Sequence, residues 1–217
     1  MDNKGKAGCG CFFILLVIIM VFLGLFIHPF TLKIIGKQFR YEDRIFKSDV
    51  IFVPYFAEDK HGETYIEAFR EYWAGNGRAI WIEDEKVLGV SLFDIIIQLA
   101  KARGIKENVI FKIEADGDEK TKIDNIKRIL IKSGVKKIII IVPEYASRRF
   151  HLLLNSRDEK LTFILKPVHV SCFKMDRWWK DGISRQLLFR EAWEIGSIYF
   201  QKFKIGDLKN TVKRKDE

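Results

Sequence analysis

Two adjacent arginines, Arg148 and Arg149, are the clearest chemical feature of this sequence. They closely follow an apolar run, and the planar guanidinium fork of arginine matches the geometry of phosphate and carboxylate groups. Ordinary surface charges at the start of a helix would explain them equally well. Glu114, which ends another apolar run, is either a catalytic acid or base or the salt-bridge partner of these arginines.

Familiar catalytic motifs are absent. The sequence contains no G-x-G-x-x-G, no P-loop, no G-x-S-x-G and no H-E-x-x-H, so it indicates no particular cofactor. The four histidines are scattered along the chain, and we therefore expect no metal site.

Five short apolar runs, rich in β-branched residues, alternate with segments of helical periodicity. The runs are 49–54, 79–82, 109–113, 137–142 and 161–165. Nearly continuous apolar strands are typical of a parallel sheet that is covered on both faces. The alternation predicts an α/β fold with a doubly wound, mostly parallel, five-stranded Rossmann-like sheet. Ser91 and Asp94 have the spacing of a capping box at a helix start.

Ligands bind to such sheets at the carboxyl ends of the strands. Four loops are expected there: 54–62, 83–90, 114–121 and 143–149. A later segment, 177–193, predicts a helix preceded by the aromatic pair Trp178-Trp179.

Residues 11–27 form an uncharged apolar run behind a leader that contains Lys4 and Lys6. Counted as 9–30, the segment has the roughly 20 residues that a helix needs to cross a ~30 Å hydrocarbon core. A buried soluble helix and a cleaved signal peptide are the alternatives. The run is long for a signal peptide, and no A-x-A-like cleavage site follows it. We therefore predict one uncleaved N-terminal transmembrane helix that contacts the lipid bilayer.

The anchor divides the chain into parts. These are a leader (1–8), the anchor (9–30), a basic linker (31–47), one α/β domain (48–205) and a basic tail (206–217) that we predict to be disordered. The net charge of +9 suits anionic partners such as lipid head groups or phosphorylated molecules, although a solvated basic surface would also explain it. Basic residues are more numerous after the anchor than before it, which by the positive-inside rule favours a cytoplasmic domain.

Several weak motifs occur in a recognisable order. A membrane anchor and basic linker precede a strand starting at Ser48, then a helix with Asp124-Asn125, a Tyr145-x-x-Arg-Arg sequence, Trp178-Trp179 and finally Glu191. This order resembles the ElyC/SanA/YdcF family of bacterial envelope proteins over roughly 48–199. The chain resembles a divergent member, because Ala146 stands where the family has a histidine after the tyrosine, and 54–60 replaces a glycine-rich turn.

The resemblance implies a single-pass protein of the bacterial inner membrane with an extracytoplasmic domain. It implies a role in cell-envelope biogenesis or barrier maintenance. The candidate ligand-binding residues are Glu114, Asp124, Asn125, Tyr145, Arg148 and Arg149, and Trp178 and Trp179 are candidates for a lid. Because loops after parallel strands converge, we expect Glu114, Asn125, Tyr145 and Arg149 around one cleft.

With Ala146 in place of a proton-transferring histidine, we predict binding of a phosphorylated or nucleotide-like anion with little turnover. An enzyme acting on a phosphorylated envelope precursor is the alternative, with Glu114 or Asp124 as base and the two arginines as an electrostatic clamp. A nucleic-acid-binding module is a further alternative only if the domain faces the cytoplasm. Its phosphate contacts would be Lys120, Lys122, Lys127, Arg128 and Lys132.

Overall fold

A five-stranded, all-parallel sheet forms the centre of the computed structural model, which describes residues 4–87, 89–114, 117, 119–154 and 161–213. The strands are β1 Val50–Val53, β2 Ala79–Glu83, β5 Ile110–Ile113, β6 Lys137–Pro143 and β7 Thr162–Val168. Their order across the sheet is β5-β2-β1-β6-β7, with Val50 of β1 in register with Ala79 on one side and Ile138 on the other. The predicted α/β class and the five parallel strands are confirmed.

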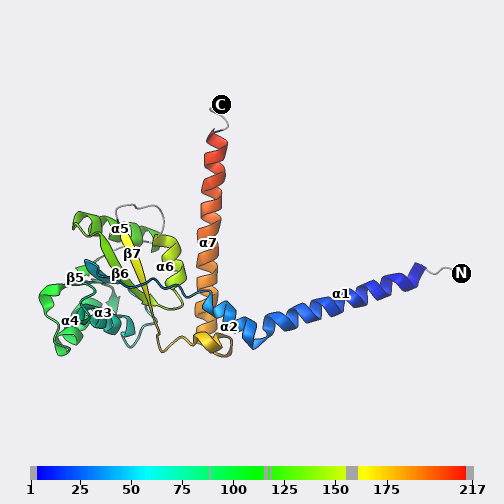
Figure 1. The fold of residues 1–217 in the computed structure, drawn as a ribbon, viewed down its shortest axis with the longest axis horizontal. Coiled ribbons are helices and arrows are strands. Elements are labelled where there is room, and N and C mark those ends of the chain that lie inside the picture. Colours follow the sequence, from blue (N-terminus) through cyan, green and yellow to red (C-terminus); the bar gives the residue numbers. More distant parts are fainter. Residues whose placement is uncertain (1–3, 88, 115–116, 118, 155–160, 214–217) are drawn as a thin grey trace.

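Helices cover both faces of this sheet (Figure 1). Helices α3 Glu63–Trp73 and α4 Leu92–Ala102 pack on one face, and α5 Glu119–Lys132 and α6 Ser147–Leu154 pack on the other. Alternate residues of a strand point to opposite faces. Val50 and Phe52 of β1 therefore join the α5–α6 core, whereas Ile51 and Val53 join the α3–α4 core. Burial on both sides explains why these strands are almost wholly apolar.

The strand order reverses at β1, because β2 and β5 lie on one side of it and β6 and β7 on the other. The chain runs from β1 to α3 on one face of the sheet and from β6 to α6 on the other. These diverging connections create a crevice at the carboxyl ends of the two strands. The loop after β1 and the start of α6 therefore meet at this edge.

The capping box predicted from Ser91 and Asp94 is wrong. The loop after β2 contains a short antiparallel hairpin, β3 Lys86–Val87 and β4 Val90–Ser91, that brings Asp84 next to α4. Asp84 accepts a hydrogen bond from the amide of Phe93 (2.9 Å), and the Ser91 hydroxyl donates to Asp84 instead of capping the helix itself. A carboxylate seven residues earlier in the chain therefore caps α4.

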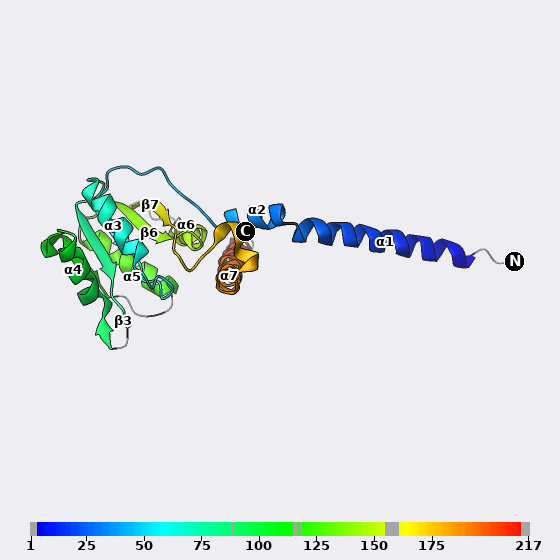
Figure 2. The same ribbon diagram turned by 90° about the horizontal axis from the view of Figure 1, so that it is seen from below.

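Two helices precede the sheet domain, α1 Lys4–Ile27 and α2 Pro29–Lys37. In both views α1 extends away from the domain (Figures 1 and 2). Within the part of the chain that the structure describes, no helix is long and apolar enough to cross a membrane. The segment predicted as a linker, 31–47, is partly helical and partly packed, since the Tyr41 amide donates to Ser147 and Asp43 pairs with the backbone of Leu165.

The C-terminal segment begins with η2 Met175–Lys180, a 3-10 helix that contains the tryptophan pair, and continues as α7 Gly182–Lys213. Helix α7 lies between the sheet domain and α1 in both views (Figures 1 and 2). It is helical into the range predicted as a disordered tail, and residues 214–217 lie outside the described part of the chain. Disorder therefore stays a prediction only for residues 214–217.

Candidate ligand pocket at the carboxyl edge of the sheet

A pocket of about 330 Å³ lies between α5 and α6 on the face of the sheet that they cover. Phe52, Ile140 and Phe163 line it from three neighbouring strands. Its walls are mainly apolar and include Ile123, Ile126 and Leu130 of α5, Phe150 and Leu154 of α6, and the loop from Pro54 to Glu58. Pockets that bind small molecules have this size and this largely apolar lining.

Lys122 and Glu83 line the pocket where β2 ends. The Lys122 ammonium lies 3.3 Å from Glu83 Oε1 and 3.3 Å from Glu85 Oε2. Partial burial alone would lower the pKa of Lys122, but the two carboxylates outweigh it and raise the pKa above its usual value. Glu83 also accepts a hydrogen bond from the amide of Tyr55 (3.0 Å) and so holds the loop after β1 in place.

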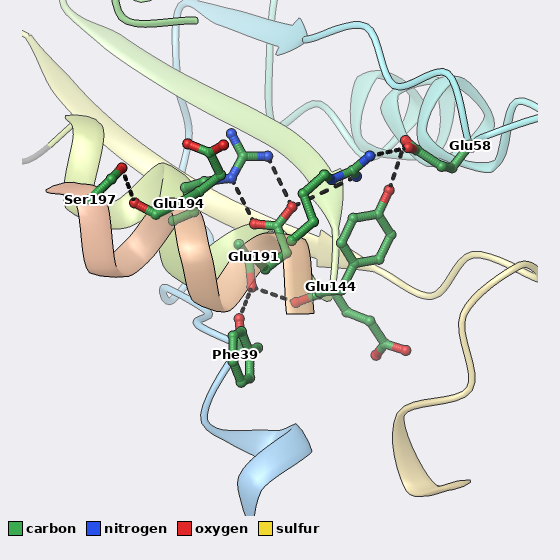
Figure 3. Close-up of polar contacts among 10 residues, drawn as sticks. Phe39, Glu58, Glu144, Glu191, Glu194 and Ser197 are labelled. Atoms are coloured by element: carbon green, nitrogen blue, oxygen red, sulfur yellow. Dashed lines mark hydrogen bonds and ion pairs between the residues drawn. The ribbon is translucent and has the colours of Figure 1, made fainter. Parts of the chain in front are cut away.

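Glu58, in the loop after β1, is bound by two residues from distant elements (Figure 3). Arg190 of α7 forms an ion pair with it, and the Tyr145 hydroxyl donates to its Oε2 at 3.3 Å. Burial would raise the pKa of Glu58, but the arginine and the tyrosine outweigh this effect, so the pKa lies below its ordinary value. Glu58 is therefore an ionised anchor of the loop and a poor proton acceptor at neutral pH.

Arg149 lines the same pocket, but its fork is occupied by Glu191. Arg149 Nε lies 2.6 Å from Glu191 Oε2 and Nη2 lies 3.1 Å from Oε1, and both side chains are buried (Figure 3). Burial raises the pKa of Glu191, although Arg149 opposes the shift. The sequence hypothesis that Glu114 is the partner of the arginines is wrong, because Glu191 and not Glu114 binds Arg149.

The structure does not bring Glu114 and Asn125 into this pocket. Glu114 is exposed after the edge strand β5 and pairs with Lys112 at 2.6 Å. Asn125 accepts a hydrogen bond from Arg128 on its own helix. Of the four residues expected around one cleft, Arg149 lines the pocket and Tyr145 reaches it through Glu58.

Asp124 and Arg148 also lie outside the pocket lining. Asp124 is exposed on α5. The Arg148 guanidinium lies 6.0 Å from the centroid of the Tyr41 ring, and the Arg148 amide donates to the carbonyl of Phe39. Arg148 therefore helps to fasten the segment after α2 to the domain.

The tryptophans are packed away from the pocket. Trp178 is buried, its indole N–H donates to the carbonyl of Leu32 at 2.7 Å, and its ring meets Trp179 edge to face at 6.1 Å. A Cβ on Gly36 would lie only 2.8 Å from Trp178 Cδ1, so α2 and η2 are in close contact. The pair joins α2 to η2, and neither tryptophan covers the pocket in the way predicted for a lid.

A second, more open groove of about 650 Å³ lies beyond the ends of β6 and β7. His169 Nδ1 lies 2.9 Å from Oε1 of the buried Glu144, whose other oxygen faces Arg40 at 3.3 Å. The basic residues that line the groove are Lys33, Lys37, Arg40, Lys174 and Arg177. Among the residues that the structure describes, no cluster of histidine, cysteine and carboxylate side chains has metal-binding geometry.

No protein-family model, curated protein or solved structure matches this chain. The family resemblance therefore stays a hypothesis. Glu58, Glu83 and Glu144 fall within the loops that the alternation of strands and helices identifies, so the sequence carried a signal for them. No sequence pattern pointed to Arg190 or His169, because their positions depend on how α7 and the end of β7 pack.

Proposed function

We propose that this protein is a membrane-anchored binding protein whose α/β domain holds an anion with an apolar body in the α5–α6 pocket. The observation that carries the proposal is the pocket of about 330 Å³, with apolar walls and ionic groups at the carboxyl edge of the sheet. A phosphorylated envelope precursor and a nucleotide-like molecule both have this combination of parts. A role in cell-envelope biogenesis or barrier maintenance rests on the family resemblance.

The lysines of the pocket support an anionic end on the ligand. Lys122 is partly exposed, and its carboxylate partners keep it cationic. Lys127 is buried, with its ammonium 5.8 Å from the centroid of the Phe163 ring. An anionic group beside these two lysines would add favourable charge interactions, which apolar walls strengthen. Arg149 does not bind the anionic group directly in this proposal, because its guanidinium fork binds Glu191.

The membrane anchor is supported by the uncharged run 11–27. As a helix rising about 1.5 Å per residue, the sequence segment 9–30 would cover a ~30 Å hydrocarbon core, and most of this segment lies in α1. Its side chains from Phe12 to Val21 are apolar and exposed. Fusions after Glu217 to a reporter active only outside the cytoplasm, and to one active only inside, would determine which side carries the domain. Exclusive activity of the inside reporter would contradict an extracytoplasmic domain.

Calorimetric titration of the full chain in lipid nanodiscs tests the binding site. Phenyl phosphate and adenosine monophosphate are the probes. Phenol and inorganic phosphate represent the apolar half and the anionic half of phenyl phosphate. We expect phenyl phosphate to bind more tightly than either half. Lys122→Met should weaken binding roughly tenfold, as expected for loss of one charge-assisted hydrogen bond. Lys120→Met removes an exposed lysine of α5 that is not part of the pocket lining and should leave binding unchanged.

Blocking the pocket provides a second test. Ala57 is exposed and lines the pocket, so Ala57→Trp should obstruct it without disturbing the core. We expect this variant to lose phenyl phosphate binding while its thermal unfolding stays as in the wild type. Unchanged binding by both Ala57→Trp and Lys122→Met would contradict this site.

His169 and Glu144 favour an enzymatic alternative in the second groove. A histidine oriented by a buried carboxylate is a common general acid or base, and the surrounding basic side chains would hold a phosphoryl group. Hydrolysis of para-nitrophenyl phosphate tests it. If this groove is catalytic, His169→Gln should lower kcat by about 10²-fold or more, and His61→Gln, an exposed histidine outside the groove, should not. Equal rates for wild type and His169→Gln would contradict catalysis there.

The nucleic-acid alternative loses part of its support. Of its five proposed phosphate contacts on α5, Lys122 is paired with Glu83 and Glu85, and Lys127 is buried. These two residues cannot belong to one solvated basic face.

A further inference from the structure

The outer face of α7 is unusually apolar. Phe189, Trp193 and Phe200 are 65%, 77% and 71% exposed. They recur at helical spacing, so they lie on one side of the helix. Glu191, which is fully buried against α6, lies two residues from Phe189 and Trp193 and nine from Phe200. With 3.6 residues per turn, all three aromatic residues are on the side of α7 opposite Glu191. The aromatic face therefore points away from the sheet domain.

This face points toward the side from which α1 leaves. In both views the sheet domain lies on one side of α7 and α1 on the other, and α7 runs crosswise to α1 (Figures 1 and 2). If α1 crosses a bilayer, α7 lies along the surface of that bilayer. A helix in this position buries its apolar face at the boundary between head groups and acyl chains, where tryptophan is favoured.

Basic residues adjoin α7 at the level where α1 ends. Lys33 and Lys37 lie on α2, which starts two residues after α1, and Arg177 lies on η2. Lys33 pairs with Asp176 at 2.9 Å. This hydrogen bond, with the nearby charges of Lys37 and Arg177, lowers the pKa of Asp176. One carboxylate therefore faces three cations, and the excess positive charge suits anionic head groups.

Several contacts fasten η2 to both α2 and α7. Trp178 of η2 bonds to the carbonyl of Leu32 in α2, and its ring meets Phe189 of α7 at 6.3 Å. The Lys174 amide donates to Ser184 at the start of α7 (3.0 Å). The basic residues of α2 and η2 and the aromatic face of α7 thus belong to one packed unit.

We propose that the aromatic face of α7 and the basic residues of α2 and η2 together form a surface that lies on the anionic bilayer holding α1. This inference rests on the membrane anchor proposed above. The contact would hold the domain close to the bilayer and fix its orientation, so that the basic groove with His169 lies next to lipid head groups.

Quenching of tryptophan fluorescence by brominated lipids tests the proposal with the full chain. The protein is placed in nanodiscs of phosphatidylcholine and phosphatidylglycerol, with and without bromine on the acyl chains. We expect bromine to quench the wild type, and Trp193→Phe to remove roughly half or more of the quenched signal, since an interfacial indole lies near the acyl chains. Trp73→Phe is the matched control, because Trp73 is 63% exposed on α3, on the other face of the sheet. It should not reduce the quenched signal.

A second measurement separates this proposal from the anchor. Recovery of the protein in vesicles after an alkaline wash reports whether α1 holds it in the bilayer. Loss from the vesicles contradicts the anchor, whereas retention with the same quenched signal in wild type and Trp193→Phe overturns the α7 contact alone. If each disc holds two copies and Trp193 is shielded both from bromine and from the aqueous quencher acrylamide, the aromatic face contacts a second copy. This outcome would also overturn the proposed contact of α7 with the bilayer.

Discussion

Arg149 and Glu191, which are 42 residues apart in the sequence, form a buried two-point ion pair between α6 and α7. Removing one partner of such a pair leaves an unpaired charge in the interior, which typically costs about 3–5 kcal/mol. We therefore expect Arg149→Met and Glu191→Leu each to lower the free energy of unfolding by about that amount. Denaturant unfolding in detergent, followed by circular dichroism, measures it.

The double variant distinguishes a buried pair from two independent contributions. Arg149→Met combined with Glu191→Leu removes both charges and fills the site with apolar groups, which is often close to neutral. We expect it to be more stable than either single variant. A loss equal to the sum of the single losses would contradict the pairing.

Gly36 and Trp178 set the distance between α2 and η2. A Cβ at Gly36 would lie 2.8 Å from Trp178 Cδ1 and 3.1 Å from the carbonyl of Met175. Gly36→Ala should therefore lower stability by about 1–3 kcal/mol, as is typical of overpacking. Thermal unfolding and the rate of proteolysis between α1 and β1 measure the effect. Gly196→Ala, on α7 with no atom within 4 Å of its Cβ, should be neutral or stabilising, so equal losses in both variants would argue against the clash.

Tyr145 connects the buried start of α6 to the loop after β1. Its hydroxyl donates to Glu58 at 3.3 Å, and Tyr145→Phe removes only this oxygen. We expect a loss of about 0.5–1.5 kcal/mol in the free energy of unfolding. The pKa of Glu58 should also rise toward its ordinary value, because one of the bonds that lowers it is lost. A carboxyl signal followed by nuclear magnetic resonance measures the pKa. Tyr199→Phe, at an exposed site on α7, is the control and should change neither quantity.

Asp49 makes stability depend on pH. Its Oδ2 accepts hydrogen bonds from the amides of Lys136 and Lys137 at 2.9 and 3.0 Å, and these bonds lower its pKa. Because the folded-state pKa of Asp49 is lowered, its ionised form stabilises the fold at pH values above the ordinary aspartate pKa of about 3.9. This stabilisation is lost as the pH falls through the folded-state pKa.

At pH 7 we expect Asp49→Asn to be less stable than the wild type by about 1 kcal/mol, and the difference to disappear below the folded-state pKa. Urea unfolding between pH 7 and 3 checks this expectation. Asp124→Asn, at an exposed site of α5, should follow the wild type at every pH. A difference for Asp49→Asn that grows as the pH falls would contradict the assignment.

The sequence alone determined the α/β class, the five strands and the four loops at the carboxyl edge of the sheet. It could do so because strands covered on both faces must be apolar along their whole length, and β1 and β6 are such runs. The same logic pointed to the loops that contain Glu58 and Glu144. These are local properties, and each is encoded within a few consecutive residues.

Only the tertiary structure decided which charged groups meet. Arg149 binds Glu191, Glu58 binds Arg190, and Glu114 binds Lys112 next to it. A carboxylate near an arginine in sequence has many possible partners, and the choice follows from how α7 packs on α6. The aromatic face of α7 became visible for the same reason, since helical spacing shows that Phe189 and Trp193 share a side, but only packing shows that this side is uncovered.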